Sequence, residues 1–156
     1  MMKKEHILPF VKATIDTFTT MVDVAPQQKD IAAIVPPLEQ NNVSAMIGLS
    51  GDAKGMVGIS MSNATALKIV SRFTGEEVTQ FGEDVTDAVG ELINIIAGGA
   101  KAEIHDMRLM ISLPSVMHGE RYYLSMPKEA PLVAITFTLP DTGDLTLCVS
   151  LIPEAG

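Results

Sequence analysis

The chain has 156 residues, 47% of them hydrophobic and 19% charged, so it can bury one sizeable core and is too apolar for a disordered protein. Its 11 basic and 19 acidic residues give a net charge of −8, which argues against binding to nucleic acid or anionic membranes, because both need clustered Lys and Arg. The sequence has one cysteine, no apolar N-terminal leader and no run of about 18 apolar residues, so we expect a cytoplasmic protein without a disulfide.

The N-terminal part of the chain predicts one helix followed by two strands. Apolar residues recur every three or four positions from Ile7 to Val22, which indicates an amphipathic helix. Residues 26–42 are expected to be a connecting stretch. Apolar runs at 43–50 and 56–61 then predict two strands, and the glycine-containing segment 51–55 predicts a hairpin loop between them.

Two further helices are expected in the middle of the chain. Ser62 or Asn63 can cap a short helix, and Gly75 fits its C-terminal end. The longest helix is expected from Glu83 to about His105. Acidic residues occupy its first turns and basic residues its end, which complements the helix dipole.

The C-terminal part reads as strands, and it decides the predicted fold class. The expected strands cover residues 109–113, 121–126, 132–139 and 145–152. A turn-forming segment at 140–144 should join the last two as a hairpin, and short loops imply antiparallel neighbours. We therefore predict an α+β fold, with an antiparallel sheet packed with long helices, in a single domain over residues 1–156.

Several common chemistries find little support in the sequence. His6, His105 and His118 are far apart and lack the spacing of a metal-ligand pair, so we expect three surface histidines and no metal site. Cys148 lies in the middle of a predicted strand, which favours buried packing over a role as nucleophile. The glycine-rich segment 48–55 lacks the spacing of a phosphate-binding loop and is better explained as a hairpin.

The long helix carries the most informative pattern. At about 100° per residue, its apolar residues fall on one side and a narrow polar stripe falls on the other. The stripe consists of Asp87, Glu91, Asn94, Gly98 and Lys101. A solvated helix face would explain charged residues there, but asparagine is a poor choice for a helix interior, and each glycine costs about 1 kcal/mol relative to alanine. We expect Gly99 to face the sheet and Gly98 to face outward, where another surface could approach closely.

These residues resemble a known family. The segment DAVGELINIIAGGAKAE, with Asp87-x3-Glu91-x2-Asn94-x3-Gly98, resembles the signature helix of the CheC/CheX/FliY phosphatases of bacterial chemotaxis. The segments PFVKATIDTFTTM and SLPSVMHGE resemble the CheX segments before and after that helix, so the resemblance covers essentially the whole chain. CheC proteins typically carry two copies of the signature, and the single copy here favours CheX. The resemblance also implies a CheC-like fold.

The resemblance implies an activity and a set of residue roles. CheX-like proteins hydrolyse the phospho-aspartate of a CheY-type response regulator by inserting the motif Glu and Asn, here Glu91 and Asn94, into the regulator's active site. Asn94 would position the attacking water, and Glu91 would pair with a lysine of the regulator. Asp87, Gly98 and Lys101 would contact this partner. The regulator supplies Mg²⁺, so no cofactor of the chain's own is expected.

Elementary chemistry agrees with these roles. An acyl phosphate has a good leaving group, so the orientation of water is the task that remains, and a carboxamide can perform it as donor and acceptor. Residues spaced i, i+3 on a helix have Cβ atoms about 5–6 Å apart, so Glu91 and Asn94 could enter one shallow site together.

Two alternatives and one assembly state complete the expectations. A non-catalytic receiver-binding or flagellar-switch-like interaction module is the main alternative, but it would have no reason to keep Glu91 and Asn94 together. A small-molecule enzyme has little support, because no convergent polar set is visible outside the long helix. The CheX resemblance implies a homodimer joined partly through strands, for which the runs 132–139 and 145–152 offer plausible edges.

Overall fold

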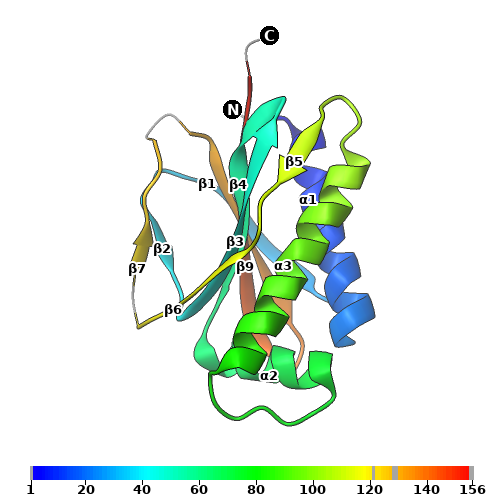
Figure 1. Ribbon diagram of the computed structural model, residues 1–156, viewed down its shortest axis with the longest axis vertical. Helices are drawn as coiled ribbons and strands as arrows, with labels where there is room; N and C mark the ends of the chain where they lie inside the picture. Colours follow the sequence, from blue (N-terminus) through cyan, green and yellow to red (C-terminus); the bar gives the residue numbers. More distant parts are fainter. Residues whose placement is uncertain (1, 121, 128–129, 155–156) are drawn as a thin grey trace.

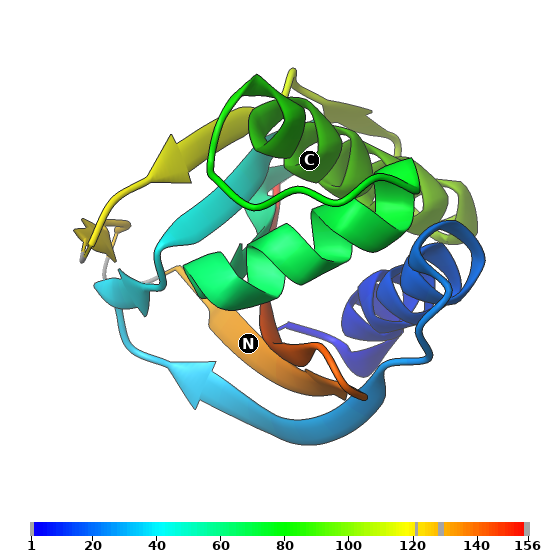
Figure 2. The same ribbon diagram turned by 90° about the horizontal axis from the view of Figure 1, so that it is seen from below.

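Helices and a sheet form two packed layers (Figure 1). Over residues 2–120, 122–127 and 130–154, which the computed structural model describes, three α-helices lie on one face of a seven-stranded antiparallel sheet. The helices are α1 (Lys4–Thr17), α2 (Asn63–Thr74) and α3 (Glu83–Glu103), and a π-helical turn, η1 (Phe18–Val22), continues α1. The predicted α+β class is confirmed. Figure 2 shows α2 lying beside α3, across one end of the helical layer.

The strands pair in the order β1-β8-β9-β4-β3-β5, and β6 also pairs with β3. Their bounds are β1 (Gln27–Ile34), β3 (Val43–Gly51), β4 (Ala53–Met61), β5 (Leu109–Ile111), β6 (Ser115–His118), β8 (Leu132–Leu139) and β9 (Gly143–Pro153). A separate two-stranded ribbon consists of β2 (Leu38–Gln40) and β7 (Tyr122–Leu124). All of these pairs are antiparallel, and the short loops predicted this arrangement for β3–β4 and β8–β9.

The main core lies between the helices and the sheet. The apolar side of α3 faces inward, and its fully buried residues are Val85, Val89, Leu92, Ile93, Ile96, Ala97 and Ala100. Each fully buried valine, leucine or isoleucine side chain contributes about 1.5–3 kcal/mol, so the apolar side fixes the rotation of α3 about its axis. The polar stripe is thereby turned away from the core.

A smaller core lies on the other face of the sheet. Met56, Leu132 and Cys148 are buried there, and partly buried residues of the β2–β7 ribbon, Leu38 and Leu124, pack against them. Cys148 is buried, as the sequence predicts, and burial raises the pKa of its thiol to about 12. The thiol is therefore protonated at neutral pH, which is unsuitable for a nucleophile.

Two expected loops are wrong in the structure. The connecting stretch 26–42 contains β1 and β2, because β1 is an edge strand whose first residues are polar and exposed and show no apolar alternation. The expected loop 51–55 is reduced to Asp52, and the strands continue on both sides of it. Gly51 makes this tight turn possible, since its φ of +103° suits glycine and a Cβ there would lie 2.5 Å from the Arg108 carbonyl oxygen.

Other boundaries also differ from the expectation. The expected strand 109–113 ends at Ile111, and β6 follows it where no strand was expected. Of the expected strand 121–126, residue 121 lies outside the described residues and 122–124 form β7. The predicted short helix is confirmed, with the Ser62 hydroxyl accepting a bond from the Thr65 amide (3.2 Å) and Gly75 in the left-handed conformation.

The expected sheet edges are wrong as well. Both 132–139 and 145–152 fall in interior strands, because β8 lies between β1 and β9, and β9 lies between β8 and β4. Their apolar composition reflects burial inside the sheet and does not mark a free edge. The free edge on that side of the sheet belongs to β1.

Candidate active site

Helix α3 presents the polar stripe to solvent. Asp87, Glu91, Asn94 and Lys101 are exposed, and a Cβ built on Gly98 would meet no atom within 4 Å. Glu83 and Asp84 lie in the first turn and Lys101 in the last, which complements the helix dipole. Packing of the buried side of α3 thus determines where the stripe lies, and the stripe side chains take no part in the core.

Part of the stripe lines a shallow hollow of about 520 Å³ beside the β5–β6 connection. In Figure 1 this connection runs alongside α3. The hollow is lined by Thr86, Asp87, Gly90, Glu91, Asn94, Leu113, Pro114 and Val116. Asp87, Glu91 and Asn94 are therefore brought together with the β5–β6 connection. Gly98 and Lys101 lie farther along the helix and do not line the hollow.

Gly90 lies where the β5–β6 segment faces α3. It is buried, and a Cβ built there would lie 3.5 Å from Val116 Cγ2 and 3.7 Å from Pro114 Cγ. The glycine thus presents bare backbone to the opposite wall, and a methyl group would fill the remaining space. Gly90, Pro114 and Val116 all line the hollow.

The side chains of Glu91 and Asn94 are available to another molecule. Across the described part of the chain, neither side chain has a hydrogen-bond or ion-pair partner. The charged residues that line the hollow, Asp87 and Glu91, are both acidic. The site therefore offers a carboxylate that can accept bonds from a cationic group, next to a carboxamide that can both donate and accept.

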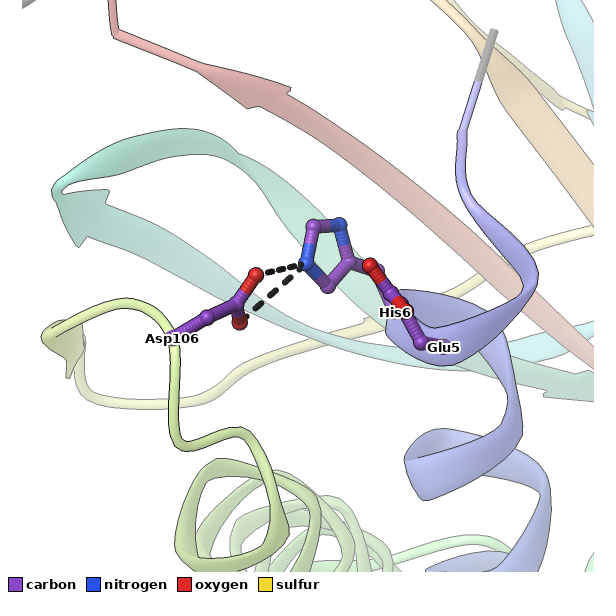
Figure 3. A group of neighbouring side chains, drawn as sticks. All are labelled: Glu5, His6 and Asp106. Carbon is purple, nitrogen blue, oxygen red and sulfur yellow. Dashed lines mark hydrogen bonds and ion pairs between the residues drawn. The ribbon is translucent and has the colours of Figure 1, made fainter.

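A second polar cluster lies at the start of α1 (Figure 3). His6 was expected at the surface but is only 4% exposed, and its Nε2 donates to the Asp106 carboxylate at 2.9 and 3.3 Å. This hydrogen bond lowers the pKa of Asp106. The correction has a simple cause, since the partner of His6 is 100 residues away in the sequence. The pair ties the first turn of α1 to the segment after α3.

The same cluster includes Glu5. Ligand atoms of Glu5, His6 and Asp106 lie within 4.8 Å of one another, a spacing that a metal ion could span. Glu5 is exposed and lies 3.8 Å from the Lys3 ammonium, and the N-terminus of α1 carries the positive end of the helix dipole. Both positive charges oppose a cation there. The geometry supports the His6–Asp106 pair as a structural link.

One predicted orientation on α3 is wrong. Gly99 was expected to face the sheet, but a Cβ built on it would lie 3.4 Å from Ala13 Cβ, so it faces α1. The helical wheel identified the residue as lying off the outward stripe, but the position of α1 on that flank of α3 depends on tertiary packing.

Leu113 is a site-lining residue that sequence reasoning missed. The sequence predicts it at the end of a strand, whereas the structure places it in the β5–β6 connection, 89% exposed and lining the same hollow as Glu91 and Asn94. The signal in the sequence was weak. It consists of an apolar residue directly before Pro114, in the segment SLPSVMHGE that already resembles CheX.

The fold is that of the CheC-like class of chemotaxis proteins. The family model of the chemotaxis phosphatase CheX matches residues 43–138, and the chain belongs to this family. None of the helices in the described part of the chain has the length and apolar character needed to cross a membrane.

Individual relatives agree with this assignment. The CheY-P phosphatase CheX of Thermotoga maritima is 35% identical over 82 residues, which are 51% of this chain and 53% of the relative, so the match spans about half of each. A CheC-like superfamily protein from Shewanella sp. PV-4 has a TM-score of 0.89 and 25% identity, over 99% of this chain and 100% of that one. A chain of the CheX-CheY-BeF3-Mg²⁺ complex from Borrelia burgdorferi has a TM-score of 0.77 and 25% identity, over 94% of this chain and 97% of that one.

Proposed function

We propose that this chain hydrolyses the phospho-aspartate of a CheY-type receiver domain by inserting Glu91 and Asn94 into the receiver's active site. The observation that carries the proposal is the exposed Glu/Asn pair, which has no partner within the described residues and lies on a well-packed helix of a CheX-family chain. The name of the Thermotoga maritima relative, CheY-P phosphatase, supports the same reaction.

Asn94 positions the water in this reaction. Its amide can accept a bond from water and donate one, which directs the water oxygen in line with phosphorus. As the water oxygen bonds to phosphorus, the bond to the aspartyl oxygen breaks, and the aspartate leaves as a carboxylate. Both protons of the water pass to the released phosphate, which exchanges them with the solvent. Catalysis through positioning suits phosphoryl transfer, where the transition state needs charge stabilisation and alignment more than covalent chemistry.

Glu91 aligns the chain with the receiver. Its carboxylate pairs with a receiver lysine near the phosphate, one helical turn from Asn94, and thereby fixes where the carboxamide enters. Mg²⁺ comes with the receiver and neutralises phosphate charge. The Borrelia burgdorferi complex, which contains CheX, CheY, BeF3 and Mg²⁺, supports this division. Asp87, Gly98 and Lys101 extend the contact along the stripe.

The direct test uses the wild-type protein. CheY-type receivers from the same cell are phosphorylated, mixed with the chain at catalytic amounts, and followed for phosphate release. At least one receiver should lose phosphate much faster than it does alone. If every receiver binds yet none loses phosphate faster, the chain is a binding module and the proposed reaction is wrong.

A further inference from the structure

Leu113 is the most exposed of the large apolar side chains in the described part of the chain, at 89%. It lies in the β5–β6 connection and lines the same hollow as Glu91 and Asn94. An isolated exposed leucine is ordinary on a protein surface, but this one borders the candidate catalytic pair. Its exposure beside this pair indicates that it contacts the molecule that enters the hollow.

The backbone around Leu113 is held in place. The Ser112 amide donates to the Gly48 carbonyl oxygen (3.0 Å), and the Gly48 amide donates to Ser112 Oγ (2.8 Å). Pro114 follows, with a fixed φ, and packs beside Gly90 of α3. Leu113 is thus presented from a pinned segment, so that little backbone entropy is lost when a partner covers it.

We propose that Leu113 is an apolar docking contact for the receiver domain, and that it sets the affinity of the complex without taking part in the reaction. This inference rests on the proposed function, because the occupant of the hollow is the receiver. The lining combines this leucine with two carboxylates, Asp87 and Glu91. It fits a partner surface in which an apolar patch adjoins a lysine or arginine, so charge complementarity and apolar contact act together.

The position of Leu113 separates binding from chemistry. Its side chain has no group that can orient water or contact phosphate, so its burial is equally favourable before and during the reaction. Uniform binding of this kind lowers KM and leaves kcat unchanged. Burial of one leucine side chain corresponds to a change in affinity of about tenfold or more.

The experiment compares Leu113→Ser with two other variants. Leu8→Ser makes the same substitution at another exposed leucine, which lies on α1 and does not line the hollow. Asn94→Ala removes the proposed water-positioning group. For each protein we would measure the melting temperature, the affinity for a CheY-type receiver loaded with Mg²⁺ and beryllofluoride, and kcat and KM for phosphate release from the phosphorylated receiver.

We expect Leu113→Ser to fold normally, to bind the beryllofluoride-loaded receiver about tenfold more weakly or worse, and to raise KM by a similar factor at nearly unchanged kcat. Leu8→Ser should match the wild type, and Asn94→Ala should lose kcat while still binding. If Leu113→Ser binds the receiver as tightly as the wild type, the docking inference is wrong and the proposed function still stands. Full activity in Asn94→Ala overturns the catalytic assignment alone, and a wild type that binds no receiver overturns both.

Discussion

At the scale of single residues, Asn94 and Glu91 show how a site can consist of side chains that the fold does not need. Both are exposed, and the apolar side of α3 carries the packing that fixes their direction. An asparagine in a helix interior is costly relative to better helix formers. The proposed role in positioning water would account for its presence on the stripe.

The first prediction follows from that cost. Asn94→Ala removes the carboxamide and should reduce the rate of receiver dephosphorylation by about 100-fold or more. The melting temperature should stay the same or rise slightly, because alanine is the better helix former and the Asn94 side chain is exposed. Phosphate release and thermal melting of the same preparation check the two halves together. A folded variant with wild-type turnover would exclude Asn94 from the reaction.

His6 and Asp106 show a different kind of residue-level constraint. The hydrogen bond from His6 lowers the pKa of Asp106 in the folded protein, so the carboxylate is stabilised by folding. The stability that the pair provides is present above the ordinary aspartate pKa of 3.8 and is lost as pH falls through the lower, folded value.

The second prediction tests this link. Asp106→Asn should melt at a lower temperature than the wild type at neutral pH, and the difference should shrink as pH falls below 3.8. Asp16→Asn is the matched control, since it breaks the exposed Lys12–Asp16 pair on the same helix as His6 and should change little. A deficit in Asp106→Asn that remains constant down to strongly acidic pH would contradict the assignment.

At the scale of elements, the sequence predicts α3 well and the margins of the sheet poorly. Val85, Leu92 and Ile96 repeat with helical period because one side of α3 is buried, and that periodicity is visible in a single sequence. β1 is half-solvated and begins Gln27-Gln28, so it has no comparable pattern. β6 is a short strand that pairs with residues 43–46 of β3, and no local sequence pattern predicts it.

In the candidate site, too, one part is predictable from the sequence and the other is not. The stripe residues could be predicted because they share one helix, whose period is known in advance. The opposite wall could not, since Leu113 and Pro114 reach the hollow through long-range pairing of β5 and β6 with β3. His6 was placed at the surface for the same reason, because its partner Asp106 is distant in sequence.

The third prediction concerns Gly98, which has open space above it. Gly98→Leu should raise the melting temperature, because leucine is a better helix former by about 0.8–1 kcal/mol or slightly less. The same variant should bind the phosphorylated receiver more weakly, since the new side chain stands between the two surfaces. Unchanged affinity would show that the partner does not approach at this point. A lower melting temperature would indicate an internal contact at Gly98.

At the scale of the whole molecule, the sheet formed by the described residues has one long free edge. β1 pairs with β8 on one side only, and Ile31 is about half-exposed on it. An unpaired edge with apolar side chains invites association, and a closed two-fold pairing would satisfy it while limiting growth to two copies. The homodimer expected from the family stays a proposal, but β1 now replaces β8 and β9 as the candidate contact.

The fourth prediction is that the chain is dimeric at micromolar concentration. Light scattering should give about twice the chain mass of 16.7 kDa. Ile31→Lys should shift the protein toward the monomer by adding charge to the edge, whereas Leu8→Lys on α1 should not. A monomeric wild type would reject the dimer, and a dimer indifferent to Ile31→Lys would move the contact away from β1.

The contact of Gly90 with Pro114 and Val116 has a consequence for transplanting this site. One wall of the hollow belongs to α3 and the other to the β5–β6 segment. A synthetic peptide copied from α3 would therefore carry Glu91 and Asn94 without the wall that faces them. Grafting the helix onto a foreign scaffold would therefore transfer the proposed catalytic pair without its surroundings. Within this fold, by contrast, substitutions in the facing wall can occur while α3 stays unchanged. The two walls of the hollow can therefore evolve separately.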